Sequence, residues 1–338
     1  MNGYDPLAVA FYDIAHEGAQ IRAIAGAIES SIDPIPDAFG VTRPGLASLA
    51  GVRARSIILL CADDLSTKCA QLAVTMSQPL AVPLVVTDSL PGYIGALDVL
   101  IVLSEKGEDH AIARAMSHAV TRGVPTILVA PGECPLATNA PNRAIIVPHL
   151  PNSVGPSPMR GLCAVLAVLE LADFDALLVV QKLHDWAAAV DEELESCSPE
   201  RDQVVNPARQ LSQLTGTIVH SALHPIGRAV ADVVATLWTM NGRVGSVLSM
   251  PELIQAQRNF PQAQTDIFYD PLLDPRPGLL PLKAVVWCAP DNQPPGPPGS
   301  VSVTMSSPLA PSSVLRLLTR AFAATAFFSV DSADSAEY

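Results

Sequence analysis

The segment from Leu97 to Ala130 constrains the fold more than any other part of this chain. Val99 to Leu103 is a continuous run of β-branched residues and leucine, which is typical of a parallel strand buried on both faces. A helix is expected to begin near Asp109 and to end before Gly123, and a return strand is expected from Thr126 to Ala130. This βαβ unit predicts a right-handed crossover, with any ligand at the carboxyl ends of the strands.

Similar apolar runs, separated by helical segments, continue the pattern along the chain. They lie at 55–61, 83–87 and 144–147 in the first half, and at 216–220, 244–249, 283–288 and 301–305 in the second. The helix predicted at 174–196 ends in acidic residues, which indicates a solvated bridging helix. We therefore predict an α/β chain with two tandem doubly wound parallel-sheet (flavodoxin-like) domains, at 1–175 and 200–338, joined by an acidic linker helix at 176–199.

Composition excludes several classes of function. The formal net charge of −13 and the pI of about 4.8 argue against a nucleic-acid partner or an anionic membrane surface. Six scattered cysteines without a CxxC pair, and no signal peptide, favour a reducing cytoplasmic location. No metal or cofactor is expected, because the cysteine spacing is wrong for zinc and no Gly-x-Gly-x-x-Gly follows Leu60. The longest apolar helix, Leu162 to Ala172, is too short to span a bilayer.

At this point the chain resembles a known family. The segment 98–130 is similar to the core of a SIS (sugar isomerase) domain, in which a strand ends in a Ser-x-Ser-Gly-x-Thr loop over a sugar phosphate. Asn206–Leu211, Met250–Leu253 and the chain end from Ala321 resemble three motifs of the bifunctional phosphoglucose/phosphomannose isomerases, in their divergent actinobacterial-type form. The resemblance implies two SIS-like domains, a phosphorylated sugar as ligand, aldose–ketose isomerase chemistry, and a homodimer among the expected assemblies.

The resemblance also implies which residues bind the sugar phosphate. Ser104 and Gly107 match the family's phosphate loop, and Ser66, Thr67, Lys106 and Arg258 are the further candidate substrate-binding residues that this chain offers beside the family's positions. The family's first loop is rich in glycine, whereas this chain has none between 61 and 68 and carries Asp63 and Asp64 there. Glu105, Glu108 and Asp109 would repel a phosphate in the second loop. Asp63, Asp64 and Asp109 are also interpreted as helix N-caps, where Asp is favoured.

The catalytic positions depart from the family as well. The resemblance places the catalytic base at Gln257, and an amide cannot act as a general base at neutral pH. Glu252 is the nearest carboxylate. His220 and His224 are candidates for ring opening or proton shuttling, although an ordinary polar or capping histidine is the more common interpretation of each. Any ligand is expected between the loop at 104–109 and the segment at 220–224.

These departures favour a SIS pseudoenzyme that binds a phosphorylated sugar or regulates sugar-phosphate metabolism. Two alternatives stay open. One is an active glucose-6-phosphate/mannose-6-phosphate isomerase that uses a non-standard base. The other is a structural partner without a ligand.

Overall fold

The computed structural model describes residues 6–36, 42–151, 153, 155–214, 216–259, 282–289, 300–304 and 310–328. The chain divides into two compact units, Met1–Glu195 and Ser196–Tyr338, and each is described by itself. The tail motif expected beyond residue 328 lies outside the described residues. The finer division into 1–175, 176–199 and 200–338, with a linker helix, stays a prediction.

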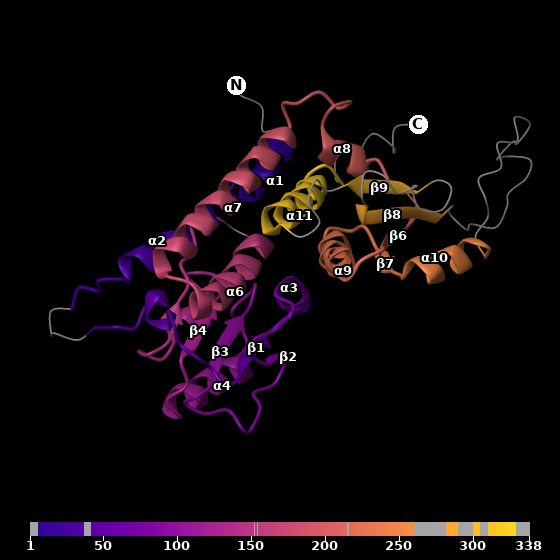
Figure 1. Cartoon of the computed structure of the whole chain (residues 1–338). Coiled ribbons are helices and arrows are strands. Elements are labelled where there is room, and N and C mark those ends of the chain that lie inside the picture. Colours follow the sequence, from indigo (N-terminus) through magenta and orange to yellow (C-terminus); the bar gives the residue numbers. More distant parts are fainter. Residues whose placement is uncertain are drawn as a thin grey trace, which may run out of the picture. The chain divides into compact units, whose positions relative to one another are not determined.

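Unit 1 alternates strands and helices (Figure 1). Its strands are β1 (Ile57–Cys61), β2 (Leu84–Thr87), β3 (Val99–Leu103), β4 (Thr126–Val129) and β5 (Ile145–Ile146). Its helices are α1 (Pro6–Ile14), α2 (Glu17–Ser30), the short η1 (Leu46–Leu49), α3 (Asp64–Met76), α4 (His110–Thr121), α5 (Pro135–Thr138), α6 (Pro158–Asp173) and α7 (Ala176–Ser196). The strands, α4 and α7 lie within a few residues of their predicted bounds, whereas α1 was not predicted.

The five strands of unit 1 form one parallel sheet in the order β2-β1-β3-β4-β5. This confirms the prediction of parallel pairing, which rested on strands that are apolar on both faces. The order changes direction between β1 and β3, whose residues Ile57 and Val99 are paired. In open α/β sheets, the carboxyl edge at such a switch point is the usual position for a ligand.

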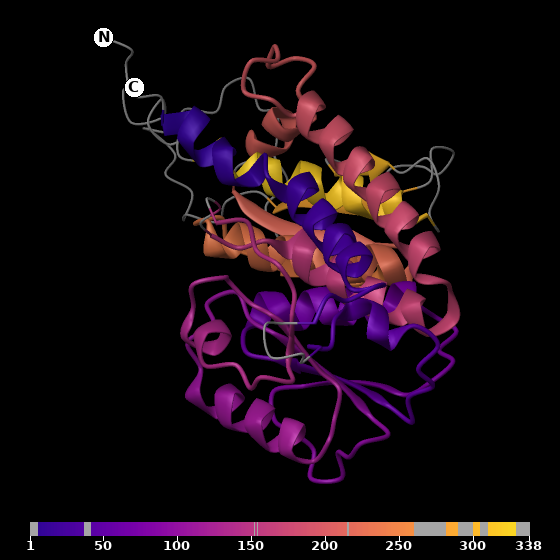
Figure 2. The same ribbon diagram turned by 90° about the vertical axis from the view of Figure 1, so that its left-hand side faces the viewer.

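Helices cover both faces of this sheet, as predicted (Figure 1). One face packs on α4, where Ile58, Leu100 and Leu128 share a core with Ile112 and Met116. Because side chains alternate along a strand, the intervening strand residues face the opposite layer, which contains α3 and α6 packed on each other. Further out, α2 and α7 lie side by side in both views (Figures 1 and 2), joined by an ion pair between Arg22 and Asp191.

Unit 2 has its own parallel sheet, with strand order β7-β6-β8-β9. The strands are β6 (Thr217–Ala222), β7 (Gly245–Val247), β8 (Leu282–Ala289) and β9 (Val301–Thr304), and the helices are α8 (Pro207–Ser212), α9 (Pro225–Met240), α10 (Met250–Gln257) and α11 (Pro311–Thr325). Val219 packs on Leu253 of α10, whereas the adjacent His220 contacts Trp238 of α9. The two helices therefore cover opposite faces of the sheet.

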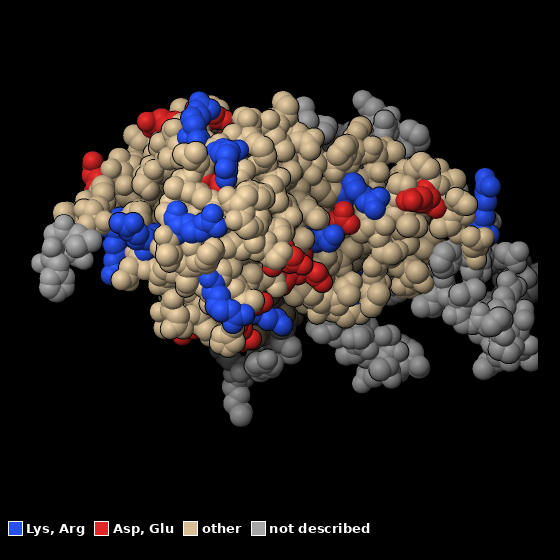
Figure 3. All heavy atoms as spheres, turned by 90° about the horizontal axis from the view of Figure 1, so that it is seen from below, with Lys and Arg blue, Asp and Glu red and all other residues tan. Residues whose placement is uncertain are grey.

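Two of the three predicted helix caps are confirmed, whereas Asp64 is the first residue inside α3 and not its cap. Asp63 accepts a hydrogen bond from the backbone N–H of Ser66, and Asp109 accepts from Ala111 and Ile112. Gly123 adopts φ of +75° just past α4, as a helix-terminating glycine does. On the face seen in Figure 3, lysine and arginine side chains are interspersed with aspartate and glutamate. Within the described ranges, no helix combines the length and apolar character needed to cross a membrane.

Candidate functional site

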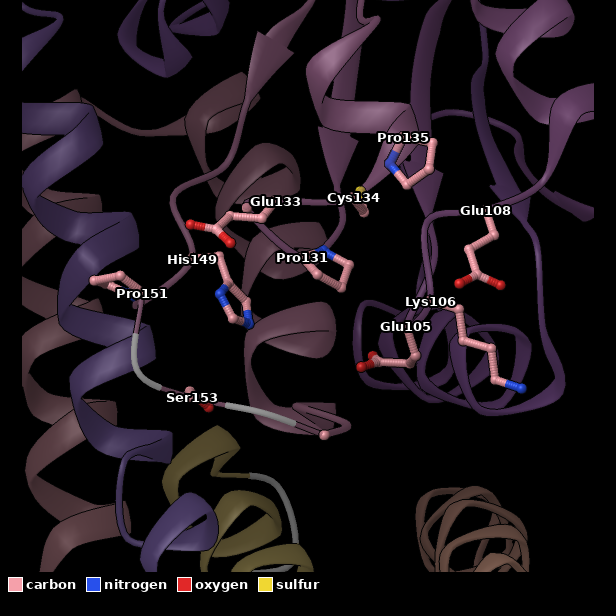
Figure 4. Close-up of a pocket in the computed structure, with 12 residues that line it drawn as sticks. Glu105, Lys106, Glu108, Pro131, Glu133, Cys134, Pro135, His149, Pro151 and Ser153 are labelled. Atoms are coloured by element: carbon pink, nitrogen blue, oxygen red, sulfur yellow. The ribbon is translucent and has the colours of Figure 1, made fainter.

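A pocket of about 550 Å³ lies at the carboxyl edge of the sheet in unit 1 (Figure 4). Its walls come from the segments that follow three neighbouring strands, β3, β4 and β5. The lining residues are Glu105, Lys106, Glu108, Pro131, Gly132, Glu133, Cys134, Pro135, His149, Pro151, Ser153 and Gly155. Figure 4 shows Glu105, Lys106 and Glu108 on one side of Pro131, and Glu133 and His149 on the other. Three carboxylates and one ammonium group make the lining acidic.

Asp63 ties the loop after β1 to the loop after β3. One carboxylate oxygen, Oδ1, accepts from the N–H of Ser66 at 2.8 Å, and Oδ2 accepts from the N–H of Glu105 at 2.8 Å. The Thr67 hydroxyl donates to the Asp63 carbonyl at 2.9 Å. The structure thus brings together the two loops that the sequence analysis singled out. Their contact runs through an aspartate, at the place where the resemblance implied a glycine-rich turn.

The loop from Ser104 to Gly107 is held tightly from within. The Ser104 hydroxyl accepts from the N–H of Gly107 at 2.8 Å, and the Gly107 carbonyl accepts from the N–H of Leu136 at 2.9 Å. Gly107 has φ of +70°, and a Cβ there would overlap the Cys134 side chain. Only glycine meets both constraints without strain. Ser104 is buried, whereas Lys106 is exposed and lines the pocket; a role of either residue in binding a ligand stays a prediction.

Glu105 links the pocket to the N-terminus of α6. Its Oε2 accepts from the N–H of Ser157 at 2.9 Å, and Ser157 is the N-cap residue of that helix. Burial raises the pKa of Glu105, while the charge of Arg160 and the Ser157 N–H lower it. A carboxylate at this position complements the positive end of the helix dipole.

A second carboxylate, Glu17 of α2, lies at the same helix N-terminus. Its Oε2 accepts from the N–H of Met159 at 2.9 Å, and its side chain is 1% exposed. Burial raises the pKa of Glu17 to about 8, although hydrogen bonding by the Ser157 hydroxyl and the Met159 N–H opposes this rise. Glu17 is therefore largely protonated at neutral pH.

Arg160 is the buried cation beneath the pocket. It is 1% exposed, and its Nη1 donates to the Ala130 carbonyl, at the end of β4, at 2.8 Å. Burial lowers its pKa, and the charges of Glu105 and Glu17 raise it. The same guanidinium lowers the pKa of His149, although burial is the larger cause there. Among the described residues, Arg160 Nε has no hydrogen-bond partner.

The histidines expected in catalysis both lie in unit 2. His220 is 0% exposed inside the sheet, and its Nδ1 accepts from Trp287 Nε1 at 3.0 Å. Burial lowers the pKa of His220 to about 4, so the ring is neutral at physiological pH. His224 is exposed and occupies the N-cap position of α9. The His224 side chain makes no capping hydrogen bond there, and a catalytic role for either histidine stays a prediction.

The other catalytic candidates lie on α10. Glu252 forms a capping box: its Oε2 accepts from the N–H of Ser249 at 2.9 Å and from the Ser249 hydroxyl at 2.6 Å. These hydrogen bonds lower the pKa of Glu252, which weakens it as a base. Gln257 is the last residue of the helix and is half-buried, and the exposed Arg258 follows it.

Glu17 and Arg160 were missed by the sequence analysis. Glu17 is the first residue of an alanine-rich amphipathic helix, where an acidic residue is expected at the solvated N-terminus. The one available signal was Arg160, a charged residue at the start of an otherwise apolar helix. No cluster of metal-ligating side chains occurs in the part of the chain that the structure describes.

Several solved structures have a fold similar to that of this chain. No family model matches the chain, and no curated protein matches it significantly. Solved structures do match over nearly the full length. The C-terminal domain of glucosamine-fructose-6-phosphate aminotransferase from Francisella tularensis has a TM-score of 0.58 at 12% identity, with 97% of each chain covered. Tagatose-6-phosphate ketose/aldose isomerase from Escherichia coli has a TM-score of 0.57 at 10% identity, with 96% of this chain and 92% of that chain covered.

A third match is glucosamine-6-phosphate deaminase from Thermotoga maritima, with a TM-score of 0.56 at 8% identity and coverage of 97% of this chain and 94% of that chain. At such low identities the likeness shows that the chain has the mixed α/β fold of these proteins, with its parallel sheets. The pocket lies at the carboxyl edge of one of those sheets.

Proposed function

We propose that this protein is a divergent SIS-type protein that binds a phosphorylated sugar in the pocket of unit 1 and does not catalyse aldose–ketose isomerisation. The observation that carries the proposal is the pocket of about 550 Å³ at the carboxyl ends of β3 to β5, in a fold shared with sugar-phosphate enzymes. Its volume suits a small-molecule ligand. Lys106 adds a positive charge at the edge of the pocket, which attracts an anionic ligand, and the carboxylates of Glu108 and Glu133 accept hydrogen bonds from sugar hydroxyls.

The absence of catalysis rests on the candidate bases. Isomerisation next to a carbonyl needs a positioned base, which contributes about 10²–10⁴-fold to the rate. Gln257 is an amide, Glu252 is held in its capping box, and the His220 ring is buried. The proposal therefore favours a binding or regulatory protein of sugar-phosphate metabolism over an enzyme. We further propose that the protein is cytoplasmic, that it forms a homodimer, and that it belongs to the actinobacterial-type branch of the phosphoglucose/phosphomannose isomerases.

Calorimetric titration of the purified protein with fructose 6-phosphate, mannose 6-phosphate and unphosphorylated fructose tests binding. We expect heat from the phosphorylated sugars only. Lys106→Ala should weaken that binding, whereas Arg114→Ala, which removes the same charge from the exposed side of α4, should leave it unchanged. No binding of any sugar phosphate would favour a purely structural protein.

A coupled spectrophotometric assay on the same protein tests catalysis. We expect no turnover of fructose 6-phosphate above background. Turnover at ordinary enzyme rates, roughly 1–10³ s⁻¹, would instead establish an active isomerase that uses a base other than Gln257. Light scattering of the same sample measures the expected dimer.

A further inference from the structure

We propose that Glu105 is an internal occupant of an oxyanion site formed by the N-terminus of α6 and Arg160, and that the phosphoryl group of the ligand takes its place. This inference rests on the proposed function and specifies how the anionic end of the ligand is recognised. Glu105 belongs to the pocket lining, so the site it fills opens directly to the pocket (Figure 4).

The N-terminus of α6 supplies backbone donors to this site. α6 has 16 residues, and its first N–H groups point away from any intrahelical acceptor. The Ser157 N–H donates to Glu105 at 2.9 Å, and the Met159 N–H donates to Glu17 at 2.9 Å. Helix N-termini bind phosphate, sulfate and carboxylate through these same N–H groups. Here the acceptors are two side chains of the protein itself.

A buried donor beside these carboxylates is left unused. Arg160 Nε has no hydrogen-bond partner among the described residues, and the Arg160 side chain is 1% exposed. The Ser157 hydroxyl lies close enough to the Glu17 carboxyl to lower its pKa. An unpaired buried donor such as Arg160 Nε is rare in native proteins and calls for an explanation. A carboxylate offers two oxygens and the Ser157 N–H already uses one of them. A phosphoryl group brings three oxygens, which can meet the backbone N–H and the guanidinium together.

The buried Arg160 needs a negative charge beside it. Among the opposite charges that act on Arg160, that of Glu105 is the larger and that of Glu17 the smaller. Burial raises the pKa of Glu17, which weakens it as a charged partner of Arg160. Moving the Glu105 side chain out would therefore remove most of the negative charge that compensates the buried Arg160, which is costly. An incoming phosphoryl group restores that charge.

Only the side chain of Glu105 has to move. Its backbone N–H stays bound to Asp63 Oδ2 at 2.8 Å, and the loop is held by the bond between Ser104 and Gly107. Rotation of the side chain into the pocket exposes the site while the loop keeps its shape. Glu105 thus acts as an autoinhibitory contact that lowers affinity for phosphate.

Glu105→Ala and Glu105→Gln test this, with inorganic phosphate as the probe and calorimetry as the readout. We expect phosphate to bind at least tenfold more tightly to Glu105→Ala than to the wild type, with Glu105→Gln in between. The matched control is Glu108→Ala, which removes the same charge from the same pocket but not from the α6 N-terminus. Its gain should not exceed about threefold, as expected for a screened charge. Adding Arg160→Gln to Glu105→Ala should abolish the gain.

Equal gains in Glu105→Ala and Glu108→Ala would overturn the inference, because general charge removal would then explain both. A gain that survives Arg160→Gln would overturn it too. If Glu105→Ala fails to fold, Glu105→Gln, which keeps the shape and an acceptor, decides by the same comparison. Wild-type binding of fructose 6-phosphate, measured separately, decides the proposed function. That function stands if the sugar phosphate binds and the variants show no difference.

Discussion

The indole Nε1–H of Trp287 donates a hydrogen bond to Nδ1 of His220 across 3.0 Å, between neighbouring strands of unit 2. Because Nδ1 accepts, the ring proton is assigned to Nε2. Trp238 packs edge-on against the imidazole at 5.0 Å between ring centroids. The relationship makes His220 a neutral member of an aromatic core.

This predicts how stability depends on acid. The pKa of His220 is about 4 in the folded protein, because of burial, and about 6.5 when unfolded. The neutral ring therefore contributes stability that is complete above pH 6.5 and is lost as the pH falls towards 4. We expect His220→Phe to remove this part of the pH dependence of urea unfolding. A midpoint above pH 6 for His220 in a proton NMR titration would contradict this and reopen its role as a proton shuttle.

Glu17 predicts the opposite trend with pH. Its folded pKa of about 8 exceeds its ordinary value of 4.5 because of burial. The protonated Glu17 contributes fully to the free energy of unfolding below pH 4.5. This contribution, about a few kcal/mol, is lost as the pH rises from 4.5 to 8. Glu17→Gln keeps an acceptor for the Met159 N–H and should flatten the urea-midpoint curve over this interval. The exposed Glu200→Gln is the control, and an equal change in both variants would show that Glu17 is not the group responsible.

Gly107 offers a matched test of steric constraint at the pocket. Gly107 and Gly51 both have φ of +70°, but a Cβ at Gly51 meets nothing within 4 Å, whereas one at Gly107 overlaps Cys134. Gly51→Ala should lower the free energy of unfolding by about 1–2 kcal/mol, because of the backbone conformation alone. Gly107→Ala should lower the free energy of unfolding by about 1–3 kcal/mol more than Gly51→Ala does, because the added Cβ overpacks against Cys134. Urea unfolding measures both, and equal costs would mean that the loop yields without strain.

Gln257→Glu tests whether the missing base alone explains the expected inactivity. The variant places a carboxylate at the end of α10, in the position that the resemblance implies for the base. We expect turnover of fructose 6-phosphate to stay below about 1% of the ordinary range of roughly 1–10³ s⁻¹, because the phosphate-binding loops are also altered. Glu252→Gln, which makes the reverse exchange on the same helix, is the matched control. Restored turnover at ordinary rates would show that the substrate site is intact.

The sequence by itself determined the elements of unit 1. The β3 strand begins at Val99 and ends at Leu103, as its unbroken apolar run predicts. The caps at Asp63 and Asp109 follow from local chemistry, because the side chain bonds to backbone only two or three residues away. Parallel pairing follows from strands that are apolar on both faces. Each of these signals is contained in a few neighbouring residues.

Only the tertiary structure decided the site. The bond between Glu17 and Met159 joins residues 142 apart, and that between Glu105 and Ser157 joins residues 52 apart. No periodicity links such positions, because their meeting depends on how α6 packs against α2 and beside the loop that follows β3. A glutamate at the start of an amphipathic helix is solvated by default. Burial changes its proton affinity, and burial is a property of the assembled layers.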